Sequence, residues 1–153
     1  MIVSRIGRTI ETFNESGKRL NRLLLSRIAR AVMTGESISE YAVTIVLVDN
    51  DEISRLNEQF LKHEGPTDVI AFPYEEQVLN GDLFVSREQA ELQAEQYGVT
   101  INNELARLVI HGLLHLIGFN DDTPARRGAM RRRENKHLAE IEKLDTVRNW
   151  ITR

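Results

Sequence analysis

The spacing of apolar residues predicts several helices along this 153-residue chain. In an amphipathic helix, apolar positions recur every three or four residues. The predicted helices cover residues 18–33, 53–60, 87–97 and 102–117, and a last stretch that Pro124 opens and that runs past Leu144. The helix at 102–117 is apolar nearly all round, which is typical of a helix at the centre of a core. The last helix is charged, so we expect it to be exposed.

Short runs of β-branched and aliphatic residues predict a small sheet. Strands are expected near residues 2–6 and at 41–48, 69–74 and 83–85. Residues 41–48 carry no charge, which predicts a strand buried on both faces. The turn-like residues 79–82 (LNGD) indicate a hairpin between the last two strands. The expected fold class is α+β, with a small, about four-stranded mixed sheet packed against several helices around a buried central helix.

Composition supports one globular domain over residues 1–153, with 41% hydrophobic and 28% charged residues. The chain has no cysteine, which excludes disulfides, thiolate nucleophiles and cysteine-based zinc sites. No uncharged apolar stretch reaches the roughly 20 residues of a membrane span. The first residues lack the pattern of a secretory signal. We therefore expect a cytoplasmic protein with no membrane partner.

The charge is unevenly distributed although the net charge is only -3. Residues 1–35 and 123–153 are basic, and the stretch between them is strongly acidic. Basic clusters of this kind are a hint of polyanion binding, and taken alone they are more often a solvated helix face. The candidate polyanion-binding residues in the last helix are Arg126, Arg127, Arg131, Arg132, Arg133 and Lys136. The other candidate path runs along residues 18–30.

Two histidines on the most apolar helix indicate a metal site. His111 and His115 are four residues apart, so both imidazoles lie on one helix face. Gly118 is expected to end the helix with positive φ and return Asp121 to the same face, with Asp122 as its rival. Two imidazoles, one carboxylate and an open position are typical of catalytic zinc. The prediction is one Zn²⁺ per chain on His111, His115 and Asp121.

Other metal-dependent functions remain open at this point. Zinc peptidases place a glutamate directly after the first histidine, and here that position is Gly112. A carboxylate from elsewhere, such as Glu104, could serve instead. A third hypothesis is a binding module without catalysis, in which the zinc is structural.

Three sequence motifs resemble the YbeY family of bacterial rRNA-processing endoribonucleases. They are HGLLHLIGF at residues 111–119, TDVIAFP at 67–73 and GDL at 81–83. The resemblance spans about residues 41–138. It implies a zinc-dependent, single-strand-specific endoribonuclease that acts in 16S rRNA 3′-end maturation and late ribosome quality control. The non-catalytic alternative then becomes a ribosome-binding module with a structural zinc.

The resemblance has two departures. Where Asp121 stands, the family usually carries a histidine that is the third metal ligand, so ligation by Asp121 is inferred from its chemistry. Where Leu61 stands, the family usually carries an arginine thought to serve the active site, and leucine cannot take that role. Thr67 and Asp68 are weak candidates for substrate contact, and capping of a turn explains them as well. His137 lies among basic residues and is expected to be exposed. The general base stays unassigned.

Overall fold

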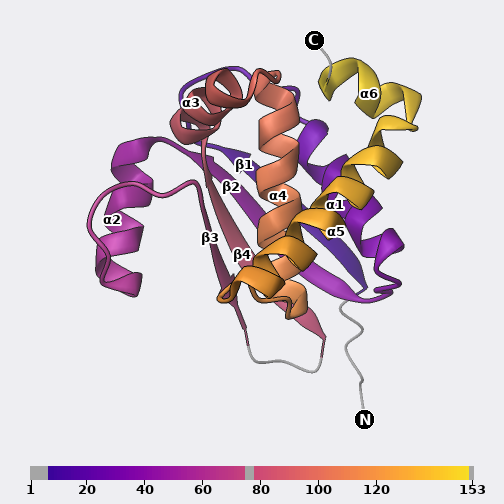
Figure 1. Cartoon of the computed structure of the whole chain (residues 1–153), viewed down its shortest axis with the longest axis horizontal. Helices are drawn as coiled ribbons and strands as arrows, with labels where there is room; N and C mark the ends of the chain where they lie inside the picture. Colours follow the sequence, from indigo (N-terminus) through magenta and orange to yellow (C-terminus); the bar gives the residue numbers. More distant parts are fainter. Residues whose placement is uncertain (1–6, 75–77, 152–153) are drawn as a thin grey trace.

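The computed structural model describes residues 7–74 and 78–151, which form four strands and six helices (Figure 1). The strands are β1 (Arg8–Asn14), β2 (Tyr41–Val48), β3 (Val69–Pro73) and β4 (Leu79–Ser86). The helices are α1 (Leu24–Gly35), α2 (Asn50–Leu61), α3 (Arg87–Tyr97), α4 (Ile101–Ile117), α5 (Pro124–Glu142) and α6 (Asp145–Ile151). No helix in the described ranges is long and apolar enough to cross a membrane.

The strands form one mixed sheet in the order β1-β2-β4-β3. β1 and β4 both run parallel to β2, and β3 runs antiparallel to β4. The predicted α+β class with a four-stranded mixed sheet is therefore confirmed. The strand expected at residues 2–6 lies outside the described residues. The strand that pairs with β2 on this edge is Arg8–Asn14.

The turn predicted at residues 79–82 is wrong, although the antiparallel pairing of β3 with β4 is confirmed. Asn80 and Gly81 lie inside β4. A Cβ atom at Gly81 would stand 2.6 Å from Leu116 Cδ2 and 2.8 Å from the carbonyl oxygen of Phe72. The glycine therefore permits close packing of α4 on the sheet, and it forms no turn.

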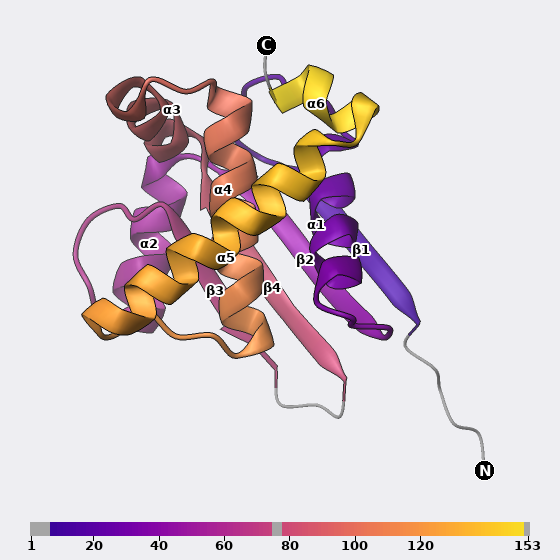
Figure 2. The same cartoon turned by 45° about the vertical axis from the view of Figure 1, so that its right-hand side comes forward.

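β2 is buried on both faces, as its uncharged sequence predicts. Ile45 and Leu47 pack into the larger core, which α1 and α4 complete. Val46 and Val48 point to the opposite face and pack in a smaller cluster with α2. Figures 1 and 2 accordingly show α1, α4 and α5 over one face, with α2 apart from them.

α4 lies at the centre of the molecule, as predicted for a helix apolar nearly all round. A Cβ atom at Gly112 would stand 3.0 Å from side-chain atoms of Val69 and Leu83, so the helix rests directly on β3 and β4. α5 crosses over α4 on the side away from the sheet (Figure 2). At Gly112 the sheet leaves no room for a side chain on the side of α4 that faces it. The polar side chains of α4 therefore lie on the other sides of this helix.

Two predicted helices differ from those observed. α1 begins at Leu24, six residues after the predicted start, because the Asn21 side chain accepts the N–H of Leu23 and holds a turn there. The single helix predicted from Pro124 to beyond Leu144 is two helices, because α5 ends at Glu142 and α6 begins at Asp145. Nor is α5 exposed throughout: His137 is only 6% exposed and Glu134 5%, so the expectation of an exposed His137 is wrong.

Candidate metal centre and adjoining cavity

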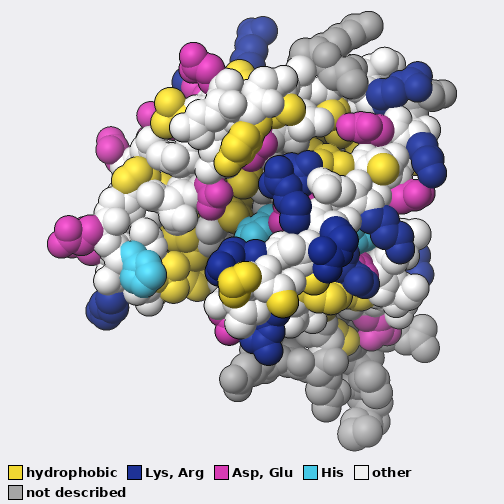
Figure 3. All heavy atoms as spheres, in the orientation of Figure 1, with side chains coloured by type: hydrophobic (Ala, Val, Ile, Leu, Met, Phe, Trp, Pro, Cys, Tyr) yellow, Lys and Arg dark blue, Asp and Glu magenta, His cyan; other side chains and the backbone are white. Residues whose placement is uncertain are grey.

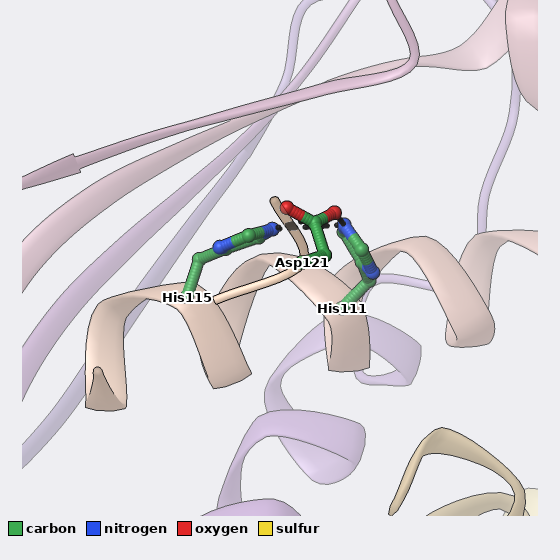
Figure 4. A group of neighbouring side chains, drawn as sticks. All are labelled: His111, His115 and Asp121. Atoms are coloured by element: carbon green, nitrogen blue, oxygen red, sulfur yellow. Dashed lines mark hydrogen bonds and ion pairs between the residues drawn. The ribbon is translucent and has the colours of Figure 1, made fainter. Parts of the chain in front are cut away.

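Local geometry brings three side chains together at the end of α4 (Figure 4). His111 and His115 lie one turn apart and both present Nε2 to the same point. Gly118 has φ +119°, a left-handed conformation that favours glycine, and it ends the helix as predicted. The reversed chain then carries Asp121 back over the helix.

The three donors have the spacing of metal ligands. The Asp121 Oδ2 atom lies 3.4 Å from the Nε2 atom of each histidine, and the two Nε2 atoms are 3.0 Å apart. Ligands about 2.0–2.2 Å from one tetrahedral ion lie roughly 3.3–3.6 Å from each other. The side chains are 25–39% exposed, so solvent reaches this side of the group. In the described part of the chain, this is the one set of three such side chains with donors within 4.8 Å.

The neighbouring acid, Asp122, points elsewhere. Its side chain is 66% exposed, and its Oδ1 atom lies 2.7 Å from Nη1 of Arg126. The guanidinium of Arg126 holds the pKa of Asp122 below its ordinary value. The geometry therefore favours Asp121 over Asp122 as the third ligand.

The structure adds Glu134, which the sequence analysis missed. Its Oε2 atom accepts a hydrogen bond from Nδ1 of His111 at 2.7 Å, and its Oε1 atom lies 3.2 Å from Nη1 of Arg107. A proton on Nδ1 leaves Nε2 of His111 free to bind a metal. Glu134 stands in the charged stretch of α5, where no local pattern distinguishes it from exposed acids.

The charges around His111 favour a cation. Burial opposes protonation of its imidazole. The hydrogen bond and charge of Glu134, together with the charges of Asp121 and Asp68, outweigh burial, and the pKa of His111 is raised. A metal ion would experience the same negative potential.

The basic candidates on α5 fall into different environments (Figure 3 shows Lys and Arg side chains gathered along α5). Arg127 and Arg131 line a cavity of about 250 Å³ beside His111. Arg126 pairs with Asp122, and Arg132 is exposed. Arg133 pairs with Glu36, at 2.6 Å from Nη2 to Oε2, and stacks on Phe119.

Lys136 lines a separate hollow between α1 and α5. Lys136 and Arg133 both line this hollow, and neither lines the cavity beside His111. Arg127 and Arg131 are thus the two α5 candidates beside the predicted metal ligands.

The weaker candidates also separate. Asp68 lines the cavity beside His111, whereas Thr67 is not among the described residues that line it. Asp68 also has local partners, since its Oδ1 atom accepts the N–H of Val69 and its Oδ2 atom accepts from Gln93. Leu61 ends α2 with its side chain 42% exposed, and it does not contribute to this cavity's described lining.

Comparison with known proteins decides the family. The family model described as Endoribonuclease YbeY matches residues 9–142. The chain belongs to the endoribonuclease YbeY family. An Endoribonuclease YbeY of Chlorobaculum parvum is 34% identical over 133 residues, which cover 86% of this chain and 94% of that protein. One of Bacteroides thetaiotaomicron is 40% identical over 110 residues, covering 71% of this chain and 79% of that protein.

A solved structure shares the fold of this YbeY-family chain. The solution structure of a Thermotoga maritima protein superposes with a TM-score of 0.65 at 29% sequence identity. The match covers 88% of this chain and 90% of that one. The similarity thus extends beyond the three sequence motifs to most of the chain.

Proposed function

We propose that this chain is a zinc-dependent, single-strand-specific endoribonuclease that acts in the cytoplasm on the 3′ end of 16S rRNA and in late ribosome quality control. Endoribonuclease activity and the link to rRNA maturation follow from membership of the YbeY family. The observation that carries the proposal is the convergence of His111, His115 and Asp121 at the edge of a cavity flanked by arginines.

In the proposed reaction, His111, His115 and Asp121 hold one zinc ion. Zinc, when bound, supplies Lewis-acid chemistry that activates water and polarises a phosphoryl oxygen. Glu134 keeps the proton of His111 on Nδ1, so that Nε2 faces the site. Asp121 brings a negative charge where the family usually has a neutral imidazole, and this charge offsets part of the metal's charge.

The arginines beside the site suit an RNA substrate. Arg127 and Arg131 line the cavity next to His111, and guanidinium groups bind phosphate oxygens through paired N–H donors. The positive groups that line this cavity are Arg107, Arg127 and Arg131, in a chain whose net charge is -3.

The alternative metal functions fit the structure less well. A zinc-peptidase glutamate at Gly112 would meet Val69 and Leu83, since a Cβ atom alone would approach both to 3.0 Å. A purely structural zinc is usually closed by four protein ligands, whereas three partly exposed donors converge here. Both features favour a hydrolase with an open ligand position.

Metal analysis and cleavage assays on the purified full chain test the proposal. We expect about one zinc per chain and cleavage of single-stranded RNA, with duplex RNA and casein left intact. His111→Ala and His115→Ala should lose both the zinc and the cleavage. His63→Ala, which changes an exposed histidine, is the matched control and should retain both. Cleavage that survives with zinc absent would overturn the proposal.

A further inference from the structure

The cavity beside His111 is lined by residues that are not among the predicted metal ligands. It has a volume of about 250 Å³ and lies against α3, α4 and α5. Glu104 lines it two turns before His111 on the same face of α4, and Glu104 is only 2% exposed. Tyr97, at the end of α3, also lines the cavity and is 59% exposed.

Glu104 is a buried acid without a partner. Within residues 7–74 and 78–151, its carboxyl group makes no hydrogen bond and no ion pair. Burial raises the pKa of Glu104, and the positive charges of Arg107 and Arg131 only partly oppose this rise. The carboxyl oxygens are open to the cavity, since no buried side-chain oxygen in the described residues lacks a partner, and they can accept hydrogen bonds from a ligand there.

The other acids of the cavity are already engaged. Asp68 accepts from Val69 and Gln93, and Glu134 accepts from Arg107 and His111. Asp121, which also lines the cavity, is the proposed third metal ligand. In the part of the chain that the structure describes, these carboxylates do not form a three-ligand cluster that would hold a second metal. The free acceptor capacity of the cavity is therefore concentrated on one carboxyl group, which suits a ligand with N–H donors.

We propose that this cavity binds one unpaired nucleobase of the RNA, with Glu104 accepting N–H groups from its Watson–Crick edge. The inference rests on the proposed function. Guanine fits best, because its N1–H and N2–H donors are adjacent and meet both oxygens of one carboxylate. Tyr97 offers a ring on which a base can stack, and Arg131 and Arg127 are placed for the phosphates on either side.

This base site gives single-strand specificity a physical origin. In a duplex the Watson–Crick edge is occupied by the partner strand, so only an unpaired base can present its donors to a carboxylate. The neighbouring His111 and Asp121 line the same cavity, which keeps the bound base next to the predicted metal. A nucleotide held in this way would position the adjacent phosphodiester for cleavage.

Equilibrium binding of short RNAs tests the inference. The probes are fluorescent 12-nucleotide oligouridines with one central guanosine, inosine or uridine, and the protein is the full chain, first treated with chelator and then reloaded with one zinc. We expect the guanosine probe to bind about 5- to 150-fold tighter than the uridine probe, with inosine, which lacks the N2 amino group, in between. The inosine comparison leaves the protein unchanged, so it does not depend on the folding of a variant.

Glu104→Gln should bind all three probes equally and retain its zinc, whereas Glu95→Gln, an exposed acid on α3, should bind them as the original chain does. RNA binding and cleavage without base preference would overturn the base site and leave the proposed function standing. Loss of all binding and cleavage in the original chain would overturn both. A second metal per chain that disappears in Glu104→Gln would make the cavity a cation site and refute the inference.

Discussion

Glu134 determines which nitrogen of His111 is free to bind a metal. Its Oε2 atom lies 2.7 Å from Nδ1 of His111, and its Oε1 atom lies 3.2 Å from Nη1 of Arg107. The residue comes from α5, while the histidine comes from α4, so the tautomer depends on the packing of two helices.

Replacing Glu134 with Gln should weaken zinc binding about 10- to 100-fold, because outer partners of metal-bound histidines have effects of this size. The measurement is a zinc titration against a competing chelator. Glu140→Gln, an exposed acid on the same helix, serves as control and should leave the affinity unchanged. Equal affinity in both variants would show that Glu134 has no part in orienting His111.

Asp121 and Asp122 should behave differently although they are adjacent. Asp121→Ala removes one of three donors and should abolish tight zinc binding, whereas Asp122→Ala removes only a partner of Arg126 and should bind zinc normally. Zinc content of the two purified variants distinguishes them. The reverse result would move the third ligand one residue along the chain.

At the scale of elements, α5 has two distinct functions. Its inward side packs against α4 and α1 through a helical stripe that includes Met130, Glu134, His137 and Leu138. Its opposite side carries the exposed arginines. Arg133 belongs partly to the first group, since it pairs with Glu36 at the end of α1. A test of RNA contact should therefore leave Arg133 in place.

The double variant Arg127→Ala, Arg131→Ala should weaken RNA binding and reduce its salt dependence. Each lost phosphate contact on a single strand should remove about 0.7 from the slope of log affinity against log salt. Zinc content should not change. Lys18→Ala combined with Arg22→Ala tests the other basic segment and should have no effect. If that pair flattens the slope instead, RNA follows residues 18–30.

At the scale of the whole molecule, a charged cluster ties α1 to α5. The Glu36 side chain is 6% exposed and pairs with Arg133 and His137. Hydrogen bonding from Arg133 first, and from His137 next, lowers the pKa of Glu36 although burial opposes this. A Cβ atom at Gly35 would stand 3.0 Å from Cε1 of His137, so the glycine allows the two helices to approach at this cluster.

Glu36→Gln should lower the free energy of unfolding by about 1 kcal/mol at neutral pH, since Arg133 is partly exposed and solvent screens the pair. A carboxyl group whose pKa is lowered by folding stabilises the native state above its unfolded pKa, and this contribution disappears as the pH falls through the folded value. The difference between the variant and the original chain should therefore vanish in acid. Urea unfolding at several pH values measures it, with Glu142→Gln as the exposed control. A constant difference at every pH would contradict the assignment.

The sequence alone determined what depends on neighbours within about one helical turn. The spacing of His111 and His115 puts both on one face of any helix they occupy, and Gly118 after that helix permits the left-handed turn that returns Asp121. The uncharged run at 41–48 likewise predicted a strand buried on both faces. Three shared motifs were enough to recognise the family.

Only the tertiary structure decided which polar residues are buried and what they contact. Glu134 and His137 lie in a helix so rich in charge that its inward stripe has no apolar periodicity, and Glu104 looks like an ordinary first-turn acid of α4. The segment around Gly81 has the composition of a turn, but pairing with β2 and β3 places this glycine inside a strand, beneath Leu116. Each of these outcomes depends on contacts between segments distant in the chain, and such contacts leave no local pattern in the sequence.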